Sequence, residues 1–273
     1  MTDTQTPSTP ISMLWESADP HAALTERFRF TSTSDANAWL RDTLAEHWGL
    51  RVEACERLVI SDANCLAWIT VDDGRMMIAK WSMEPRLFGR LAAIARLTGW
   101  LGERGIPVSM PHPARDGRVQ VEVDGFSIGL QRVIDGELLD IADAAQVEAA
   151  GEMLARMHTE MASYPEQIPT DEPPAPGTQL VGNDFRSANI LWVDGGIVAV
   201  LDLEEATYRR RVDDLAQAAV LLGTRYHDWR PTPVEVRAAF VAAYERVLPL
   251  EEDEAGALDD IVEAHLAHIP WPA

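Results

Sequence analysis

One continuous stretch, residues 180–203, constrains the fold of this chain more than any other. It reads as a short polar loop, an apolar strand, a tight turn and a second apolar strand. The turn reads Asp-Gly-Gly at residues 194–196, which is a strong signal for a β-hairpin. Because a hairpin brings its outer ends together, we expect Asp184 and Asn189, in the loop, to lie near Asp202, at the end of the second strand.

These three oxygen-bearing side chains predict a site for phosphoryl transfer. Mg²⁺ prefers oxygen ligands and usually completes its shell with water and phosphate. In phosphoryl transfer, one Asp accepts the proton of the attacking hydroxyl, while an Asn and a second Asp hold metal against the phosphates. We therefore predict Asp184 as the catalytic base, with Asn189 and Asp202 as metal ligands. The alternative is a solvated hairpin whose Asp and Asn residues only make turns, and we adopt it for Asp194.

The same residues carry a family resemblance. Asp-Phe-Arg-Ser-Ala-Asn at residues 184–189, Val-Leu-Asp-Leu at 200–203 and Asp-Asp-Leu-Ala at 213–216 resemble the aminoglycoside phosphotransferase (phosphotransferase enzyme) family. The resemblance covers most of the chain from about residue 56 onward, and it implies a protein-kinase-like fold and phosphorylation of a small molecule. The family's catalytic loop begins His-Gly-Asp, whereas residues 182–184 read Gly-Asn-Asp, so the histidine is missing.

The resemblance also implies which residues contact the phosphates. Lys80 ends an apolar run and resembles the strand lysine that reaches the α- and β-phosphates. The turn at residues 61–64 would cover the phosphates, with Asn64 where the family commonly has Asn, although the turn contains no glycine and can equally be an ordinary hairpin turn. Arg186, two residues past the predicted base, would add positive charge near the transferring group. Asp214 resembles the structural Asp that braces the catalytic loop.

Residues 131–134 resemble the family's hinge, where the backbone groups of Gln131 and Val133 would bind the purine edge of ATP or GTP. A further residue that the family resemblance leads us to expect is missing. The predicted helix over residues 85–104 carries no Glu at the position that orients the lysine in kinases.

The predicted fold class is α+β, in the two-lobed protein-kinase-like form. We expect a flexible tail over residues 1–30, a small nucleotide-binding lobe of mainly antiparallel strands with a helix over residues 31–134, and a larger, mainly helical lobe over residues 135–273 with the catalytic loop, metal and acceptor site. Apolar periodicity predicts a strong amphipathic helix over residues 143–161. His158 lies on the apolar face of that helix, so we interpret it as a core histidine.

Composition limits the classes of partner and the cellular compartment that we expect for this protein. The net charge of -21 argues against a nucleic acid partner, whose phosphates need basic patches. It suits a cationic small molecule, and it equally suits an acidity that only keeps the protein soluble. Two cysteines imply no disulfide framework, and no stretch has the length of a membrane span or the pattern of a signal peptide. We therefore expect a cytoplasmic protein without a membrane partner.

Three hypotheses follow for function. The first is a Mg²⁺-dependent kinase that phosphorylates a hydroxyl of an aminoglycoside-type antibiotic, with ATP or GTP as donor and a role in antibiotic resistance. The second is a metabolic kinase for an amino alcohol, a sugar or a secondary metabolite. The third is a nucleotide-binding pseudokinase or interaction protein, which the missing loop His, helix Glu and Gly-rich turn would favour.

Overall fold

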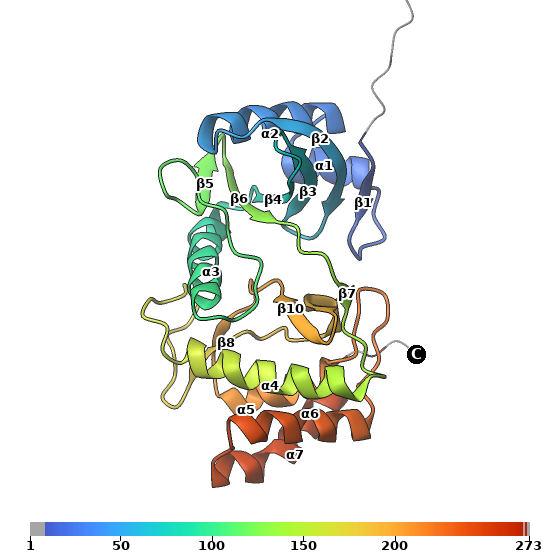
Figure 1. The fold of residues 1–273 in the computed structure, drawn as a ribbon, viewed down its shortest axis with the longest axis vertical. Helices are drawn as coiled ribbons and strands as arrows, with labels where there is room; N and C mark the ends of the chain where they lie inside the picture. Colours follow the sequence, from blue (N-terminus) through green and yellow to red (C-terminus); the bar gives the residue numbers. More distant parts are fainter. Residues whose placement is uncertain (1–8, 270, 272–273) are drawn as a thin grey trace, which may run out of the picture. The chain divides into compact units, whose positions relative to one another are not determined.

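The protein divides into two units (Figure 1). A computed structural model describes residues 9–269 and residue 271. The first unit comprises Met1–Ala95 and Met110–Val133, and the second comprises Arg96–Ser109 and Ile134–Ala273. The predicted division between residues 134 and 135 therefore lies one residue from the observed one, whereas the prediction placed residues 96–109 in the other lobe.

Two backbone carbonyls within residues 96–109 accept hydrogen bonds from other residues of the second unit. The Val200 N–H donates to the Pro107 carbonyl over 2.7 Å. The Arg156 side chain donates to the Gly105 carbonyl over 3.0 Å. Both hydrogen bonds are made beyond the long helix α3 (Pro85–Glu103), within which the division between the units falls.

A six-stranded sheet forms the centre of the first unit. In spatial order its strands are β1 (Ile11–Met13), β2 (Val52–Ile60), β3 (Cys65–Val71), β4 (Met76–Ser82), β6 (Phe126–Arg132) and β5 (Gln120–Val123). Only the pairing of β1 with β2 is parallel, so the predicted mainly antiparallel sheet is confirmed. Burial alternates along β4, with Met77, Ala79 and Trp81 in the core and Lys80 half-buried between them. Lys80 therefore belongs to the opposite face of the sheet.

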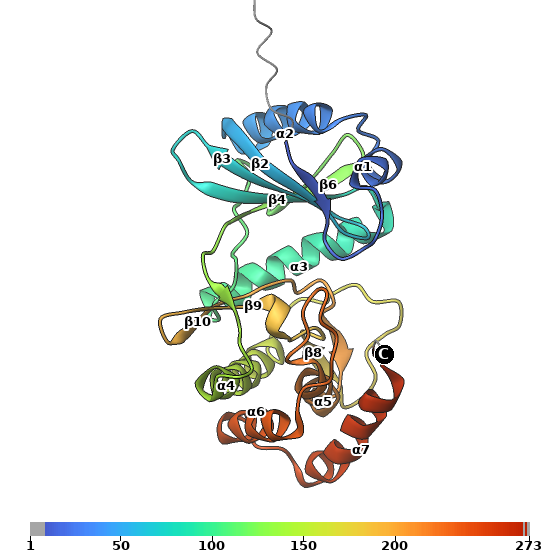
Figure 2. The same cartoon turned by 90° about the vertical axis from the view of Figure 1, so that its right-hand side faces the viewer.

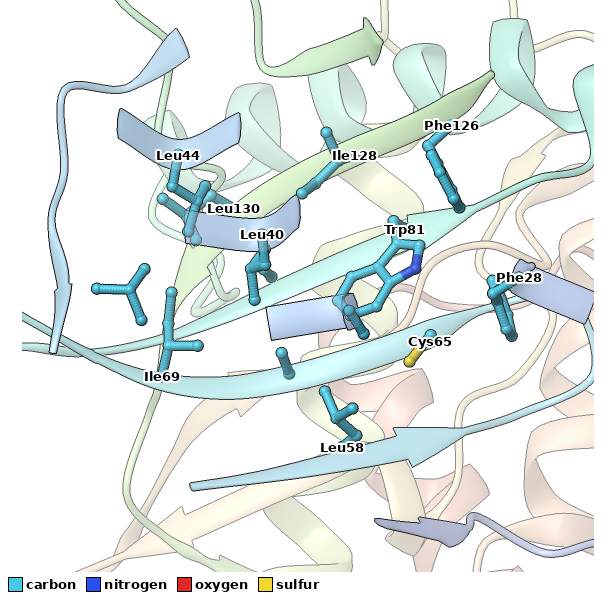
Figure 3. Packing of buried hydrophobic residues seen from close by; sticks show 14 of the residues in the cluster. Phe28, Leu40, Leu44, Leu58, Cys65, Ile69, Trp81, Phe126, Ile128 and Leu130 are labelled. Carbon is cyan, nitrogen blue, oxygen red and sulfur yellow. The ribbon is translucent and has the colours of Figure 1, made fainter. Parts of the chain in front are cut away.

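Helices α1 (Pro20–Phe28) and α2 (Thr33–His47) pack on the core face of the sheet (Figure 3). Each begins at a capping side chain, Asp19 before α1 and Ser32 before α2. The structure differs here from the predicted tail over residues 1–30. Residues 11–13 form a strand and residues 20–28 form a helix, because Leu24 and Phe28 bury their side chains in the core. Residues 1–8 of the predicted tail lie outside the described residues.

The second unit is mainly helical (Figure 2). Its helices are α4 (Ala144–Met161), α5 (Arg211–Leu221), α6 (Val234–Val247) and α7 (Glu252–His268). Helix α4 crosses α6 closely at Gly151, where an added Cβ would lie 2.3 Å from the Phe240 carbonyl oxygen. The strong amphipathic helix predicted over residues 143–161 is therefore present, and its apolar face packs against a partner helix.

Short strands of the second unit carry the stretch from residue 180 to residue 203. Strand β8 (Gln179–Val181) pairs with β11 (Thr207–Arg209), and β9 (Ile190–Val193) pairs with β10 (Gly196–Val200) and with β7 (Glu137–Leu138). The predicted hairpin is present, and its turn places residues 194 and 195 at φ angles of 44° and 88°. Within residues 9–269, none of the helices combines the length and the apolar character needed to cross a membrane.

Candidate active site

The loop after β8 brings three of the predicted side chains into direct contact. Arg186 donates from Nε to Oδ1 of Asp184 over 2.7 Å. Asn189, at the end of a 3₁₀ turn (Ser187–Asn189), donates from Nδ2 to the other carboxylate oxygen of Asp184 over 2.7 Å and to the Asp184 carbonyl over 2.9 Å. Each carboxylate oxygen of Asp184 thus accepts one hydrogen bond, which fixes the orientation of the side chain.

The Asp184 carboxyl group lies in a largely buried position. Its side chain is 22% exposed, and that of Arg186 is 14% exposed. Burial raises the pKa of Asp184 above its ordinary value, and the charge of Asp202 acts in the same direction, while Arg186 and Asn189 lower it. Because the net shift is upward, the carboxylate is a stronger proton acceptor than an Asp in water.

Asp202 follows the hairpin and lies near this loop. The Leu201 N–H donates to the Asn189 carbonyl over 2.7 Å, which fastens the chain just before Asp202 to the loop. Asp202 has a φ of 53°, a left-handed conformation that Asp adopts more readily than most residues. The structure thus places Asp184, Asn189 and Asp202 in one part of the second unit, as the hairpin geometry predicts.

The oxygen atoms in this region suit a hard divalent cation. Asp202 offers a carboxylate and Asn189 an amide oxygen. Both side-chain hydrogen bonds of Asn189 use Nδ2, so its Oδ1 points away from Asp184. Within residues 9–269, no cluster of three His, Cys, Asp or Glu side chains forms a metal site. Mg²⁺ is commonly held by one or two carboxylates together with water and substrate phosphates, so the donor set fits that ion.

Arg186 is held on two sides and carries one unused donor. Beside its bond to Asp184, its guanidinium lies 5.4 Å from the ring centroid of Trp229, at cation–π distance. Its Nη1 atom is buried and has no hydrogen-bond partner among the described residues. A buried guanidinium nitrogen without a partner is costly, and an anionic group on a ligand would satisfy it. Nothing in the sequence indicated the contact between Arg186 and Trp229.

Lys80 lies in β4 of the first unit. It pairs with Leu66 of β3 and with Gly129 of β6. Lys80 is the only lysine in the sequence, since 22 of the 23 Lys and Arg residues are arginine. Lysine is a compact point charge and does not replace arginine freely.

The turn at residues 61–64 is held by a residue that the sequence did not indicate. Arg27 donates from Nη1 to the carbonyls of Ser61 and Asp62 over 3.1 Å and 3.3 Å, and it pairs with Glu16 over 2.5 Å. Asn64 closes the turn, because its carbonyl accepts the Ser61 N–H over 2.9 Å, and it is 8% exposed. An arginine fixed by an ion pair therefore restrains a turn that contains no glycine.

The predicted hinge groups are partly occupied within the first unit. Gln131 lies opposite Ile78 in the β4–β6 ladder. The Val133 N–H donates to the Met76 carbonyl over 3.1 Å, so this donor is already used inside the unit. Val133 can then offer its carbonyl oxygen to a purine, and the role of Gln131 and Val133 in nucleotide binding remains a prediction.

Asp214 and His158 lie beneath the catalytic loop. His158 is fully buried, and its two ring nitrogens lie 2.8 Å from the Tyr244 hydroxyl and 2.8 Å from Oδ2 of Asp214. The other carboxylate oxygen of Asp214 accepts the Asn183 N–H over 3.0 Å. His158 is therefore a packed core histidine, as its helix face indicates, and Asp214 contacts the loop directly.

Sequence comparison identifies related proteins over part of the chain. Residues 167–259 match the model of the phosphotransferase enzyme family. A homoserine kinase from Cupriavidus necator is 37% identical over 86 residues, which are 32% of this chain and 26% of that protein. A homoserine kinase from Methylobacillus flagellatus is 34% identical over 103 residues, which are 37% of this chain and 31% of that protein. The chain thus spans less than a third of the length of these curated relatives.

Structure comparison identifies relatives over most of the chain. An amicoumacin kinase, solved with AMP-PNP, Ca²⁺ and its antibiotic, has a TM-score of 0.66 at 15% identity and covers 85% of this chain and 87% of its own. A macrolide 2′-phosphotransferase from Brachybacterium faecium has a TM-score of 0.58 at 17% identity, covering 88% and 99%. A choline kinase from Cryptosporidium parvum has a TM-score of 0.55 at 10% identity, covering 84% and 85%.

These comparisons confirm two predictions. The chain has the protein-kinase-like α+β fold of these phosphotransferases. Its resemblance to the phosphotransferase enzyme family is also confirmed, because the matching segment contains the catalytic loop and the hairpin that follows it.

Proposed function

We propose that this protein is a phosphotransferase that moves the γ-phosphoryl group of ATP or GTP to a hydroxyl group of a small molecule. The observation that carries the proposal is the contact set around Asp184, in which an Arg and an Asn from the same loop hold a partly buried carboxylate close to a second Asp. The family match over residues 167–259 supports the reaction type.

Asp184 is the proposed proton acceptor. The acceptor oxygen forms a bond to the γ-phosphorus while the bond from phosphorus to the β,γ-bridging oxygen breaks, and that electron pair leaves with the nucleoside diphosphate. The hydroxyl proton passes to the Asp184 carboxylate. The raised pKa of Asp184 suits it to this task, and its two hydrogen bonds hold it in one orientation.

Positive charge in the site is the second part of the proposal. Arg186 places its unpaired Nη1 atom beside the base, where it would bind the transferring phosphoryl group. Asn189 and Asp202 would hold Mg²⁺, which neutralises charge on the phosphate oxygens when bound. Lys80 would bind the α- and β-phosphates, and its being the only lysine of the chain supports this role. Asn64, Gln131 and Val133 complete the proposed nucleotide contacts.

The acceptor is a small molecule with a hydroxyl group, and two classes are supported by different relatives. The structures of an amicoumacin kinase and a macrolide phosphotransferase favour an antibiotic. The homoserine kinase matches favour a small amino alcohol, and they have the higher sequence identity, although over shorter segments. The net charge of -21 is compatible with an amine-bearing acceptor in either class.

Nucleotide binding can be tested without knowing the acceptor. We expect ATP or GTP to raise the melting temperature of the protein only in the presence of Mg²⁺; at a hundredfold excess over Kd, the stabilisation is about 2.7 kcal/mol. A lysine-acylating nucleotide probe should modify Lys80, and free nucleotide should prevent that modification. Since the only other primary amine of the chain is its N-terminus, the labelled peptide identifies the site without ambiguity. No melting shift with either nucleotide would contradict the proposal and favour an interaction protein.

The acceptor class can then be read from a panel. Rates of ADP or GDP release should be compared for homoserine, choline, an aminoglycoside, a macrolide and a neutral sugar. We expect acceptor-dependent release with a hydroxyl compound that also bears an amine. Release with the neutral sugar alone would contradict the amine-bearing acceptor, while Mg²⁺-dependent nucleotide binding without release for any acceptor would favour a pseudokinase.

A further inference from the structure

Asn183, which precedes the proposed base, is held at three of its polar groups, the backbone N–H, the backbone carbonyl and the side-chain oxygen. Its N–H donates to Oδ1 of Asp214 over 3.0 Å. Its carbonyl accepts a hydrogen bond from Nε2 of Gln217 over 2.6 Å. Its side-chain oxygen accepts one from Nη1 of Arg209 over 2.5 Å. We call these three partner residues the Asn183 clamp.

The Asn183 clamp is itself tied together. Arg209 lies at the end of β11 and also donates from Nη1 to Oε1 of Gln217 over 2.8 Å. Gln217 and Asp214 lie three residues apart on α5, so they belong to one face of that helix. The Gln217 amide therefore accepts from Arg209 on its oxygen and donates to the loop from its nitrogen. This fixes the orientation of the amide group.

The backbone conformation of Asn183 sets the direction in which the chain continues into Asp184. Asn183 has a φ of 64°, a left-handed conformation that Asn adopts more readily than most residues with a Cβ. A rotation about its backbone would move Asp184, the next residue, away from Arg186 and Asn189. The hydrogen bonds of the Asn183 N–H and of the Asn183 carbonyl lie on the two sides of its α-carbon, and both oppose that rotation. The clamp therefore acts on the position of the proposed base.

The missing loop histidine adds a second reason. Residue 182 is a buried glycine, and an added Cβ there would lie 3.8 Å from Cε of Met157 and 3.9 Å from Cδ2 of Leu203. These are ordinary van der Waals distances, so Met157 and Leu203 border the backbone at this residue without excluding a Cβ. Because glycine has no side chain, residue 182 cannot brace the loop, and the polar contacts come from the neighbouring Asn183 instead.

We propose that Gln217 and Arg209 are positioning residues, which hold Asn183 and thereby Asp184 in the place of the missing loop histidine. The inference rests on the proposed function, since it concerns the orientation of the proposed base. Neither residue touches the reacting atoms, and both act through Asn183.

The test uses a substitution that changes one hydrogen bond. Gln217→Glu keeps the shape and the oxygen that accepts from Arg209, but it replaces the donor to the Asn183 carbonyl by a carboxylate oxygen. We expect kcat to fall about 10- to 100-fold, while the KM for nucleotide stays within about twofold, because a displaced base impairs the transfer step and leaves nucleotide contacts intact. Arg210→Gln is the matched control, since Arg210 is the exposed neighbour of Arg209 and its side chain, among the described residues, forms hydrogen bonds only with Asp213.

A second readout separates this inference from the proposed function. Amide hydrogen exchange in the peptide that covers residues 182–189 should be at least about tenfold faster in Gln217→Glu than in the wild type or in Arg210→Gln. This measurement needs no turnover. An inactive wild type would therefore contradict the proposed function, while the exchange experiment would still test whether Gln217 holds the loop. Unchanged exchange in the loop, or a kcat of Gln217→Glu within twofold of an active wild type, would overturn the positioning role.

Discussion

Arg186 donates from Nε to Oδ1 of Asp184 over 2.7 Å, so the proposed base and its nearest positive charge come from one loop, two residues apart. The same Arg keeps a buried Nη1 without a hydrogen-bond partner among the described residues. Arg186 therefore has two separable effects. It lowers the pKa of Asp184, which burial raises, and it can bind an anion that reaches the loop.

Replacing Arg186 by Gln should move the pH dependence of kcat/KM. The base must be ionised to accept a proton, so activity is lost as the pH falls through the pKa of Asp184. Since the charge of Arg186 holds that pKa down against burial, its removal should shift the acid limb of the profile to higher pH. Activity at neutral pH should also fall by about 10-fold or more, because a charged donor is lost. An unchanged acid limb would mean that Asp184 is not the group that titrates. Arg230→Gln is the control, because Arg230 is an exposed arginine whose only ion pair within residues 9–269 is with Asp228.

Asp202→Asn should abolish the Mg²⁺-dependent binding of nucleotide. Asn tolerates the left-handed backbone that residue 202 adopts, so we expect the variant to fold. The melting shift with nucleotide and Mg²⁺ should disappear, because the amide supplies no charge to the metal. Asp194→Asn is a close control, since Asp194 also has a positive φ and lies in the turn of the same hairpin. A full melting shift in Asp202→Asn would contradict the metal assignment.

Arg27→Ala should weaken nucleotide binding through the turn at residues 61–64. The substitution removes the hydrogen bonds to the Ser61 and Asp62 carbonyls, so the glycine-free turn loses its restraint. We expect the KM for nucleotide to rise about three- to tenfold while kcat changes by less than twofold. Arg118→Ala serves as the control, because the Arg118 side chain, within the part of the chain that the structure describes, pairs only with the exposed Asp116. Equal KM values for nucleotide in the two variants would show that the turn at residues 61–64 does not contribute to nucleotide binding.

Glu254→Gln should destabilise the second unit in a pH-dependent way. Burial raises the pKa of Glu254, but the hydrogen bonds and charge of Arg211 and the Glu251 N–H outweigh it, so the net pKa is lowered. A lowered pKa means that the folded state binds fewer protons than the unfolded state between the two values, so stability rises with pH there. The variant should lose about 1–2 kcal/mol at pH 7, and this difference should shrink as the pH falls below about 4. Urea unfolding at pH 7 and at pH 3.5 measures both values, and equal losses at the two pH values would contradict a charge effect.

Much of the candidate site can be predicted from the sequence because its determinants are local. Asp184 and Asn189 lie five residues apart in one loop, and the Asp-Gly-Gly turn fixes the hairpin that returns the chain to Asp202. Helix α4 is equally local, since its apolar periodicity spans 18 residues. The fold class follows from the resemblance of these local motifs to the phosphotransferase enzyme family, and the structure comparison confirms it.

The remaining contacts join parts of the chain that are far apart in sequence. Arg27 reaches the turn across 34 residues and Gln217 reaches Asn183 across another 34, so neither spacing has a local signature. The helix that carries Arg27 lies in a stretch whose Thr- and Pro-rich beginning resembles a disordered tail. The engaged N–H of Val133 depends on the register of two strands, which apolar patterns do not specify to a single residue.

The most direct test of the central claim is a phosphoryl-transfer assay. It uses γ-³²P-labelled ATP or GTP, Mg²⁺ and the acceptor panel. The account predicts label in an acceptor product for the wild type, and a loss of about 100-fold or more for Asp184→Asn, which keeps the shape of the side chain but cannot take the proton. The Asp194→Asn variant should transfer label at the wild-type rate. Transfer by Asp184→Asn at the wild-type rate, or no labelled acceptor from the wild type with any member of the panel, would contradict the account.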